Sequence, residues 1–532
     1  MNLTAGAVGD SDTTSQRAEA IALGLLILAA LVARLPGLTE SLWYDETWST
    51  RVVLGNFGDA IRVGLEDVHP PLYTLIMYAW TRVFGDTELS ARAIPLMAGL
   101  ATIAMMPALG SRLATRNAGW VAAVLLTVSP IHIWYSQEAR QYSLIMFMTV
   151  VVVLLWHRLK DRSTPGGRIL FVALCAAMAQ LHYFAVAVPA ALAASALWQR
   201  RHVGLALWAL GVSTVGVVVL IGVKTVMYGM MTEEVYLGAF TPTAAVKLFF
   251  KWFTLGGALR LSPNDPPAAN LAGYVIAGIA MLLTGCWLVL GWTRLRRPEF
   301  VEHLLLLLAI PGLLLVLYVV GQRHYYIERS ALPSLPFFML AIGAGATLIR
   351  RVSVRRFALA ATLGGAGLIL AVYRGKPDVW TVYKPNPDWR TVTRSGSGFP
   401  SRERLVVFST TPLRELVYYL TDAAECSWPP LPPAQQVFHG TAREKLARLF
   451  ARSVRPTCGA EGNARARLYV NVNPAGNWVD SVRAHEPGAR SIVVVNRFWP
   501  GETAKLISDL RASGHALQLL SRGRGLEVYA LD

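Results

Sequence analysis

The chain contains a series of apolar blocks separated by charged or turn-forming residues, and these blocks limit the folds that it can adopt. Eleven blocks have the composition of helices inside a hydrocarbon core about 30 Å thick. They are Ile21–Leu35, Ala91–Gly110, Gly119–Trp134, Tyr142–Trp156, Ile169–Leu181, Phe184–Trp198, Val203–Val223, Leu271–Trp292, His303–Val320, Leu332–Ile349 and Phe357–Tyr373. Only 16% of the 532 residues are charged, whereas soluble proteins carry about 25%. The sequence therefore predicts a polytopic α-helical membrane protein with about 11 transmembrane helices.

The charges between these blocks predict the topology. Basic residues are concentrated in every second loop, whereas the loop from 36 to 90 carries eight acidic residues and three arginines. Because basic loops stay on the cytoplasmic side, we expect the N-terminus inside and the acidic loop outside. An odd number of spans then puts the C-terminal segment outside as well. The net charge of +17 follows from this loop pattern and from a basic C-terminal segment, and does not indicate a nucleic-acid partner.

Two aromatic-rich segments are too short to span a bilayer. The apolar run Leu72–Phe84 suits a helix lying at the membrane surface, and treating it as a span would put the basic loops outside. The run Lys247–Phe253 suits a second surface helix on the outer side. We therefore expect interfacial helices in the first outer loop and after the seventh span.

The composition changes at about Arg374, where Pro, Gly and Arg become frequent. We divide the chain into a membrane domain, 1–373, and a small soluble α/β domain, 374–532. Strand-like and helix-like runs alternate in the second part, namely strands at Leu405–Ser409, Ala466–Val472, Ser491–Val495 and Gly525–Ala530 and helices at Ala442–Arg452 and Thr503–Ser513. Cys426 and Cys458 also lie there and could form a disulfide in an oxidising compartment.

The first outer loop carries acids beside the membrane. Asp45 and Glu46 stand between aromatic residues, and Asp67 and His69 follow before the next apolar run. Carboxylates at a membrane boundary are costly unless they contact water, a cation or a substrate. A carboxylate could act as a general base toward a hydroxyl. A solvated loop or a helix cap is the alternative explanation, and a turn before Pro70 is the alternative for His69.

Further polar side chains lie at the outer ends of the predicted spans. They are Arg92, Tyr135, Gln137, Glu138, Arg140, His182, Tyr183, Arg323 and Arg329. Arginine suits phosphate because its planar fork donates to two oxygens, and aromatic rings can stack on a sugar. The same arginines could instead reach toward lipid headgroups, and Glu138 could pair with Arg140. A site with acids, arginines and aromatic rings at the membrane boundary favours a lipid-phosphate sugar as substrate.

Four motifs together resemble a known family. Leu42–Glu46, His69–Tyr73, Trp134–Arg140 and Glu328–Pro333 are similar to motifs of the bacterial branch of glycosyltransferase family 39. That family is similar to protein O-mannosyltransferases and lipid A aminoarabinose transferases, all of the membrane-embedded GT-C class. Asp388–Arg390 is a weaker similarity outside the main match.

The resemblance implies an inverting, single-displacement transfer of a sugar from a polyprenyl phosphate to a lipid, glycan or protein acceptor at the outer face of a bacterial plasma membrane. Asp45 would hold the acidic position of the first loop, as general base or as the residue that positions the acceptor, with Glu46 beside it. Arg92 and Arg329 match arginines of the family, although Ser330 replaces the aromatic residue that usually follows the second one.

Two histidines stand at positions where relatives carry basic residues. His69 precedes Pro-Pro where relatives have His or Lys, and His182 replaces a lysine of the aminoarabinose branch. A weaker phosphate contact or a different sugar would follow from the second replacement. Asp45 and Glu46 could alternatively bind a divalent cation, but the first loop has no Asp-x-Asp spacing or His cluster, and we expect no cofactor.

Two other functions remain open from the sequence. A transporter or flippase of envelope lipids or glycans would carry ionisable residues within its spans and paired repeats. The predicted spans are nearly free of charge in their interiors and no repeat is detectable. A non-enzymatic scaffold would depend on the C-terminal domain and not on the acidic loop.

Overall fold

The structure is a computed structural model that describes the membrane part almost throughout and the C-terminal part in pieces. The described residues are 6–50, 56–228, 239–254, 267–292, 297–321, 325–375, 388–389, 405–409, 426–427, 457–458, 466–470, 490–496, 500–512, 514–523 and 526–531. The chain divides into two compact units. The first contains Met1–Leu38, Arg92–Val218 and Tyr236–Tyr383, and the second contains Thr39–Ala91, Val219–Val235 and Lys384–Asp532.

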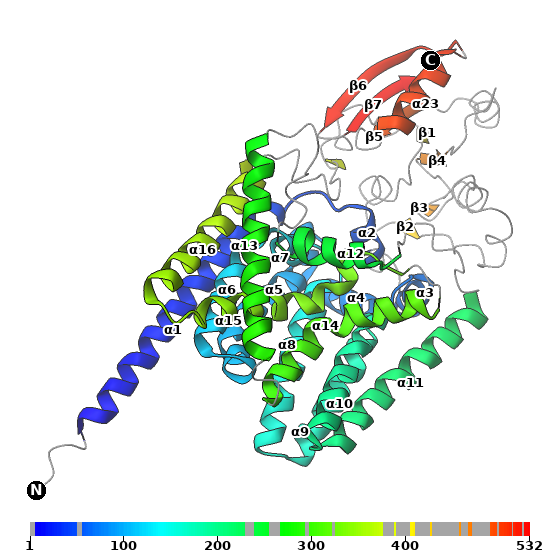
Figure 1. Ribbon diagram of the computed structural model, residues 1–532. Coiled ribbons are helices and arrows are strands. Elements are labelled where there is room, and N and C mark those ends of the chain that lie inside the picture. Colours follow the sequence, from blue (N-terminus) through cyan, green and yellow to red (C-terminus); the bar gives the residue numbers. More distant parts are fainter. Residues whose placement is uncertain are drawn as a thin grey trace, which may run out of the picture. The chain divides into compact units, whose positions relative to one another are not determined.

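Every predicted apolar block contains a helix (Figure 1). The helices are α1 (Gly6–Arg34), α5 (Glu88–Leu113), α6 (Arg116–Val128), α7 (Pro130–Ser136), α8 (Tyr142–Asp161), α9 (Pro165–Ala179), α10 (Ala187–Gln199), α11 (Val203–Tyr228), α13 (Pro267–Trp292), α14 (Pro298–Val319), α15 (Leu335–Thr347) and α16 (Val352–Gly375). Among the described residues, six helices are long and apolar enough to cross a membrane, or seven if one bent pair is a single span. The chain is therefore a multi-pass membrane protein, and the count of eleven spans stays a prediction.

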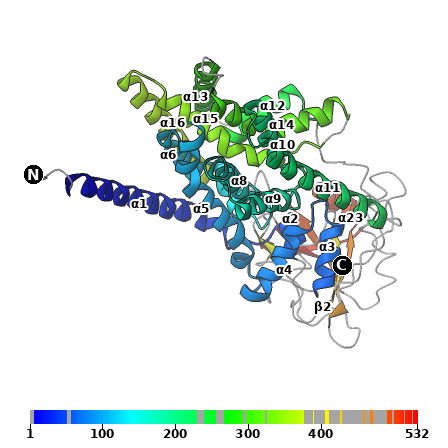
Figure 2. The same cartoon turned by 90° about the horizontal axis from the view of Figure 1, so that it is seen from below.

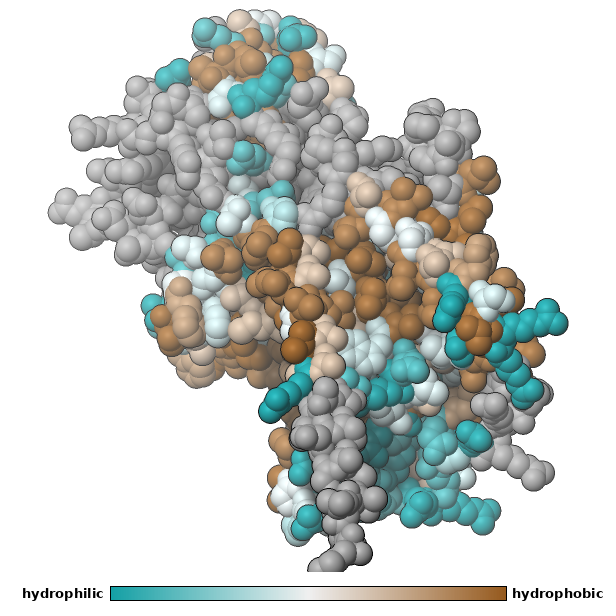
Figure 3. All heavy atoms as spheres, turned by 90° about the vertical axis from the view of Figure 1, so that its left-hand side faces the viewer, coloured by the Kyte–Doolittle hydropathy of each residue, from teal (hydrophilic) through white to brown (hydrophobic). Residues whose placement is uncertain are grey.

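Apolar side chains are exposed along these helices, as expected for surfaces that face lipid. In α1 they include Leu25, Leu28 and Val32. Figure 3 shows apolar side chains gathered over much of the middle of the face to which α1 belongs.

One predicted span is broken. The block Gly119–Trp134 forms two helices, α6 and α7, which meet at an angle of 68°. Pro130 has no backbone N–H and disfavours a helical conformation in the residue before it. Ser129 accordingly has an extended backbone (φ −66°, ψ 119°). The prediction of one continuous helix here is wrong, and the break redirects the residues that lead to Trp134–Arg140.

Helix α15 forms the core of the first unit. Its residues from Leu335 to Ala346 are buried, and it packs against α6 and α13. Helices α13, α15 and α16 lie side by side in both views (Figure 1 and Figure 2). A glycine permits the close packing of α15 against α6, because a Cβ on Gly343 would lie 2.4 Å from the carbonyl oxygen of Ala118. Small residues play this role between helices that have no hydrophobic driving force in lipid.

A buried polar network joins α8, α10 and α14 near their ends. Glu302 is fully buried, and its Oε2 accepts hydrogen bonds from Lys160 Nζ (2.9 Å) and Ser195 Oγ (2.8 Å). His157 Nε2 lies 2.8 Å from the other carboxylate oxygen. Because the acid is paired with a cation at helix ends, it does not form the midspan charge expected of a transporter.

The second unit contains three short helices from the first loop, α2 (Tyr44–Thr50), α3 (Phe57–Glu66) and α4 (Leu72–Phe84). Helix α4 has the 13 residues predicted for a surface helix, and Gly85 ends it with φ of 77°. In the first unit, the predicted surface segment Lys247–Phe253 follows α12 (Pro242–Lys247) as a π-helix, η4 (Leu248–Phe253).

The C-terminal part of the second unit contains a mixed five-stranded sheet in the order β4-β1-β5-β7-β6. The strands are β1 (Leu405–Ser409), β4 (Ala466–Val470), β5 (Arg490–Asn496), β6 (Leu517–Gly523) and β7 (Leu526–Leu531), with α23 (Pro500–Ala512) between β5 and β6. Strands β4, β1 and β5 run parallel, and β7 pairs antiparallel with both β5 and β6. The four predicted strands are confirmed, β6 was not predicted, and the predicted helix Ala442–Arg452 lies outside the described residues.

Candidate functional site

In the first unit, several predicted site residues gather around a tyrosine that the sequence analysis did not select. The Tyr142 ring contacts the rings of Tyr135 and His182, with centroid distances of 5.3 and 6.1 Å. The guanidinium of Arg329 lies 5.6 Å from the centre of the Tyr142 ring. Tyr142, His182 and Arg329 also line a small cavity of about 200 Å³, open mouth included. We call Tyr135, Arg140, Tyr142, His182 and Arg329 the Tyr142 cluster.

His182 is held neutral within this cluster. Burial, together with the positive charges of Arg329 and Arg140, lowers the pKa of the imidazole to about 3. Its Nδ1 accepts a hydrogen bond from the N–H of Phe184 (3.2 Å), which caps the short helix η3 (Tyr183–Val186). The positive charge of the cluster therefore comes from the two arginines, and His182 contributes a polar ring. Tyr183, half-buried, is the first residue of η3.

The segment Trp134–Arg140 is fixed by hydrogen bonds to buried groups. Glu138, 2% exposed, accepts from the indole N–H of Trp134 (3.0 Å). The Gln137 amide donates to the carbonyl oxygen of Arg34. A Cβ on Gly37 would lie 2.7 Å from Nε2 of Gln137, so only glycine leaves room for this amide. The orientation of Gln137 thus depends on a turn a hundred residues earlier in the chain.

Arg34 itself holds the helix break. Its guanidinium is fully buried and donates to the carbonyl oxygens of Leu126 (3.2 Å) and Thr127 (3.3 Å) at the end of α6. Because Pro130 interrupts the helix, these carbonyl oxygens have no backbone N–H within α6 that could donate to them. The same guanidinium reaches Nδ1 of His132 in α7 at 2.6 Å. Arg34 was missed, although an arginine within an apolar segment is a signal of function or of a buried partner.

Arg92 does not extend to the headgroups. It is 1% exposed, and Nη1 donates to the carbonyl oxygens of Gly37 and Leu38, both at 3.1 Å. This contact fixes the turn η1 (Leu35–Gly37) and the residue that follows it. The predicted phosphate contact of Arg92 stays a prediction beside this observed structural role.

In the second unit, the two predicted catalytic acids occupy different environments. Glu46 is 1% exposed, and its Oε2 accepts from the backbone N–H of Trp43 (3.1 Å), as the acid of a capping box does. Asp45 precedes it in the first turn of α2 and is half-buried. Glu46 therefore has the contact expected of a helix cap, which was the alternative explanation for the two acids. Asp45 stays the candidate base.

Two residues of the weak similarity at Asp388–Arg390 are described, and they lie in the same unit as this motif. Asp388 Oδ1 accepts a hydrogen bond from Ser41 Oγ (3.4 Å), and Trp389 is fully buried. Ser41 directly precedes Leu42–Glu46. The structure thus joins two stretches 347 residues apart in the second unit.

Asp67 and His69 lie in the connection between α3 and α4, where a lysine fixes the backbone. Lys224, near the end of α11 and 7% exposed, donates from Nζ to the carbonyl oxygens of Asp67 and His69, each at 2.6 Å. The backbone N–H of His69 lies 3.4 Å from Asp67 Oδ1. Lys224 is a second residue that the sequence analysis missed, because it stands at the end of an apolar block where basic residues are common.

The predictions for Arg323 and for the absence of a metal site are also untested. Arg323 lies outside the described residues. Within the part of the chain that the structure describes, no three His, Cys, Asp or Glu side chains are grouped so that they could hold a metal ion. The absence of a metal site therefore stays a prediction for the whole chain.

Comparisons with known proteins agree on one class. Residues 68–228 match the family model of dolichyl-phosphate-mannose-protein mannosyltransferases. This range includes His69, Arg92 and Trp134–Arg140. The fold matches the crystal structure of ArnT from Cupriavidus metallidurans in the apo state, with a TM-score of 0.59 and 14% sequence identity over 96% of this chain and 98% of that one. The GT-C resemblance is confirmed.

The same ArnT bound to undecaprenyl phosphate matches with a TM-score of 0.55 and 14% identity, over 95% of this chain and 97% of that one. No curated protein sequence matches this chain. At this identity the structural match establishes the fold alone, and the match to the family model covers residues 68–228.

Proposed function

We propose that this protein is a membrane glycosyltransferase that moves a sugar from a polyprenyl phosphate to a hydroxyl-bearing acceptor at the outer face of a bacterial plasma membrane. The observation that carries the proposal is the Tyr142 cluster, where Arg140 and Arg329 lie near a neutral His182. Two arginines bind a phosphate group well, because each guanidinium donates to two oxygens.

The cluster suits a leaving group that gains negative charge. When the bond between the sugar and the phosphate breaks, the departing polyprenyl phosphate carries additional charge, and fixed guanidinium groups stabilise it. The rings of Tyr135 and Tyr142 offer apolar faces beside those charges. Asp45 takes the proton from the attacking hydroxyl, and the displacement inverts the anomeric centre.

The test is transfer of radiolabelled sugar from a panel of polyprenyl-phosphate sugars, by the purified protein, to lipid, glycan and peptide acceptors extracted from envelopes of cells that lack it. We expect Asp45→Asn to lower the rate of transfer by about 10²–10⁴-fold. Arg329→Gln should raise the KM for the donor. Asp86→Asn, in the same loop, is the matched control and should transfer at the normal rate.

Two outcomes would count against the proposal in different ways. Normal transfer by a well-folded Asp45→Asn variant removes Asp45 as the base but leaves the enzyme. Failure of the unmodified protein to bind polyprenyl phosphate or to transfer any sugar of the panel contradicts the function itself. Mass spectrometry of envelope glycans and lipids, with and without the protein, identifies the sugar and the acceptor through the missing mass.

A further inference from the structure

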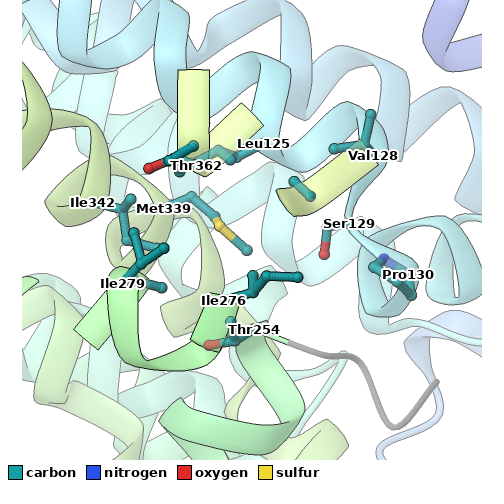
Figure 4. A pocket seen from close by; sticks show the side chains of 13 residues that line it. Leu125, Val128, Ser129, Pro130, Thr254, Ile276, Ile279, Met339, Ile342 and Thr362 are labelled. Atoms are coloured by element: carbon teal, nitrogen blue, oxygen red, sulfur yellow. The ribbon is translucent and has the colours of Figure 1, made fainter. Parts of the chain in front are cut away.

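A second cavity lies in the first unit, away from the Tyr142 cluster. It is enclosed by the break between α6 and α7, the end of η4, and the helices α13, α15 and α16 (Figure 4). Its empty space is about 470 Å³, open mouth included. Most of the lining is aliphatic, for example Leu125, Ile276, Met339 and Ile342. An apolar ligand is therefore the chemical class that fits it.

Three hydroxyl groups line this cavity, and one of them differs from the others. Thr254 and Thr362 donate to carbonyl oxygens of their own helices, at 2.8 and 2.7 Å. Ser129, 5% exposed, has a buried Oγ with no hydrogen-bond partner among the described residues. Figure 4 shows its side chain at the helix break, beside the space that Ile276 and Thr254 also border. A buried hydroxyl without a partner is unfavourable, so an acceptor atom on a ligand would complete this site.

The mouth of the cavity indicates what enters it. The lining residues that are only half-buried include Ile276 and Ile279 of α13 and Ala361 and Ala366 of α16. The outer sides of the same helices carry large exposed apolar side chains, namely Val275, Leu282, Phe357 and Leu368. In a membrane protein such a surface faces hydrocarbon. Water would find few polar partners in this cavity, whereas a hydrocarbon chain lies directly outside it.

The position of Ser129 along the chain further restricts the class of ligand. It is the last residue before α7, a helix of seven residues that meets α6 at an angle of 68° and leads to Trp134–Arg140. Seven residues of helix are only about 10 Å long. The predicted topology puts Trp134–Arg140 at the outer membrane boundary, so Ser129 lies close to the depth of the ester groups of the outer leaflet.

We propose that this cavity binds one acyl chain of a glycerophospholipid, with an ester carbonyl oxygen accepting a hydrogen bond from Ser129. The bound lipid fills the space beside the helix break that redirects Trp134–Arg140. This site is separate from the proposed donor site, and the inference does not depend on the proposed function.

The test uses the full-length protein in lipid nanodiscs that contain a phospholipid with a photoreactive diazirine in one acyl chain. After irradiation, peptide mapping by mass spectrometry should find labelling around residues 125–130, 276–280 and 361–366 at several times the level on the exposed face of α11. Ala361→Phe should reduce this labelling several-fold, because the ring occupies the cavity. Leu368→Phe is the matched control on the outer side of α16 and should not reduce it.

Ser129→Ala tests the hydrogen bond separately, since it removes one oxygen without adding volume. Native mass spectrometry should show that this variant retains less co-purified phospholipid than the unmodified protein does. If Ala361→Phe fails to fold, Ala366→Leu replaces it. Equal labelling of α11 and α16 would overturn the proposal, because the lipid contacts would then be non-specific. Displacement of the label by equimolar polyprenyl phosphate would overturn the phospholipid assignment.

Discussion

Arg34 Nη2 lies 2.6 Å from Nδ1 of His132, and this contact joins α1 to α7 across 98 residues of sequence. The same side chain satisfies carbonyl oxygens at the end of α6. One buried cation thus stabilises both sides of the helix break that redirects Trp134–Arg140. A break at Pro130 leaves carbonyl groups without their helical partners, and Arg34 supplies the donors.

We expect Arg34→Met to destabilise the protein by several kcal/mol, because each buried carbonyl left without a donor costs about 1–3 kcal/mol. Thermal unfolding of the purified protein measures the loss, and hydrogen exchange should rise in residues 130–140. The control is Arg116→Gln, which removes an exposed ion pair with Glu19 and should change the unfolding temperature little. Equal losses in the two variants would contradict the assigned role of Arg34.

Lys224 should matter for the connection that carries Asp67 and His69. Lys224→Gln shortens the side chain and removes a cation that donates to both carbonyl oxygens at 2.6 Å. We expect greater protease sensitivity of residues 66–71 and a raised KM for the lipid-phosphate donor, with partial rescue by Lys224→Arg. Lys247→Gln is the matched control. An unchanged KM and cleavage pattern would show that the lysine does not hold this segment.

The neutral state of His182 predicts a pH dependence of stability. The folded pKa is about 3, below the ordinary value of 6.5, so between these values the unfolded chain binds a proton that the folded chain does not. The stability contributed at pH 7 is therefore lost as pH falls below 6.5, by about 1.4 kcal/mol per pH unit. Unfolding measured at pH 7.5 and pH 5 should show a smaller difference in His182→Gln. Identical pH slopes in both proteins would contradict a neutral His182.

Gly345 should tolerate no larger residue. A Cβ there would lie 2.0 Å from the carbonyl oxygen of Leu283, a backbone atom that cannot rotate away. We expect Gly345→Ala to separate α13 from α15 at a cost of about 1–3 kcal/mol, the range for overpacked cores. Gly312→Ala is the control, because nothing lies within 4 Å of the added carbon. A thermal shift no larger than that of the control would refute the close packing.

Cys426 and Cys458 are register partners in the antiparallel ladder of β2 (Cys426–Ser427) and β3 (Thr457–Cys458). Cα atoms of directly opposed residues lie about 4.5–5.5 Å apart, a separation that a disulfide can bridge. If the C-terminal segment faces an oxidising compartment, we expect the two thiols to resist alkylation until a reductant is added. Peptide mapping under non-reducing conditions measures this. Alkylation of both cysteines without reductant would exclude the bond.

Much of the local structure could be read from the sequence, because helix length and apolar composition are local properties. The blocks Tyr142–Trp156 and Leu271–Trp292 became α8 and α13, and the 13 residues of α4 have the predicted bounds. Strand β6 could not be predicted, since its sequence Leu517–Gly523 has no clear alternation and pairs with β7 only through the hairpin. The apolar pattern also gave no indication of the 68° bend after α6.

The order of residues was enough to show which residue types lie at the ends of the predicted helices and, through four motifs, a resemblance to the GT-C class. Which of these residues lie together became visible only in the packed helices. That packing surrounded Tyr142 with Arg329 and His182, and it committed Arg92 to the carbonyls of Gly37 and Leu38. A buried cation donates hydrogen bonds to the acceptors that the packed helices place near it. Those acceptors come from segments far apart in the sequence, so a local pattern of residues cannot identify them.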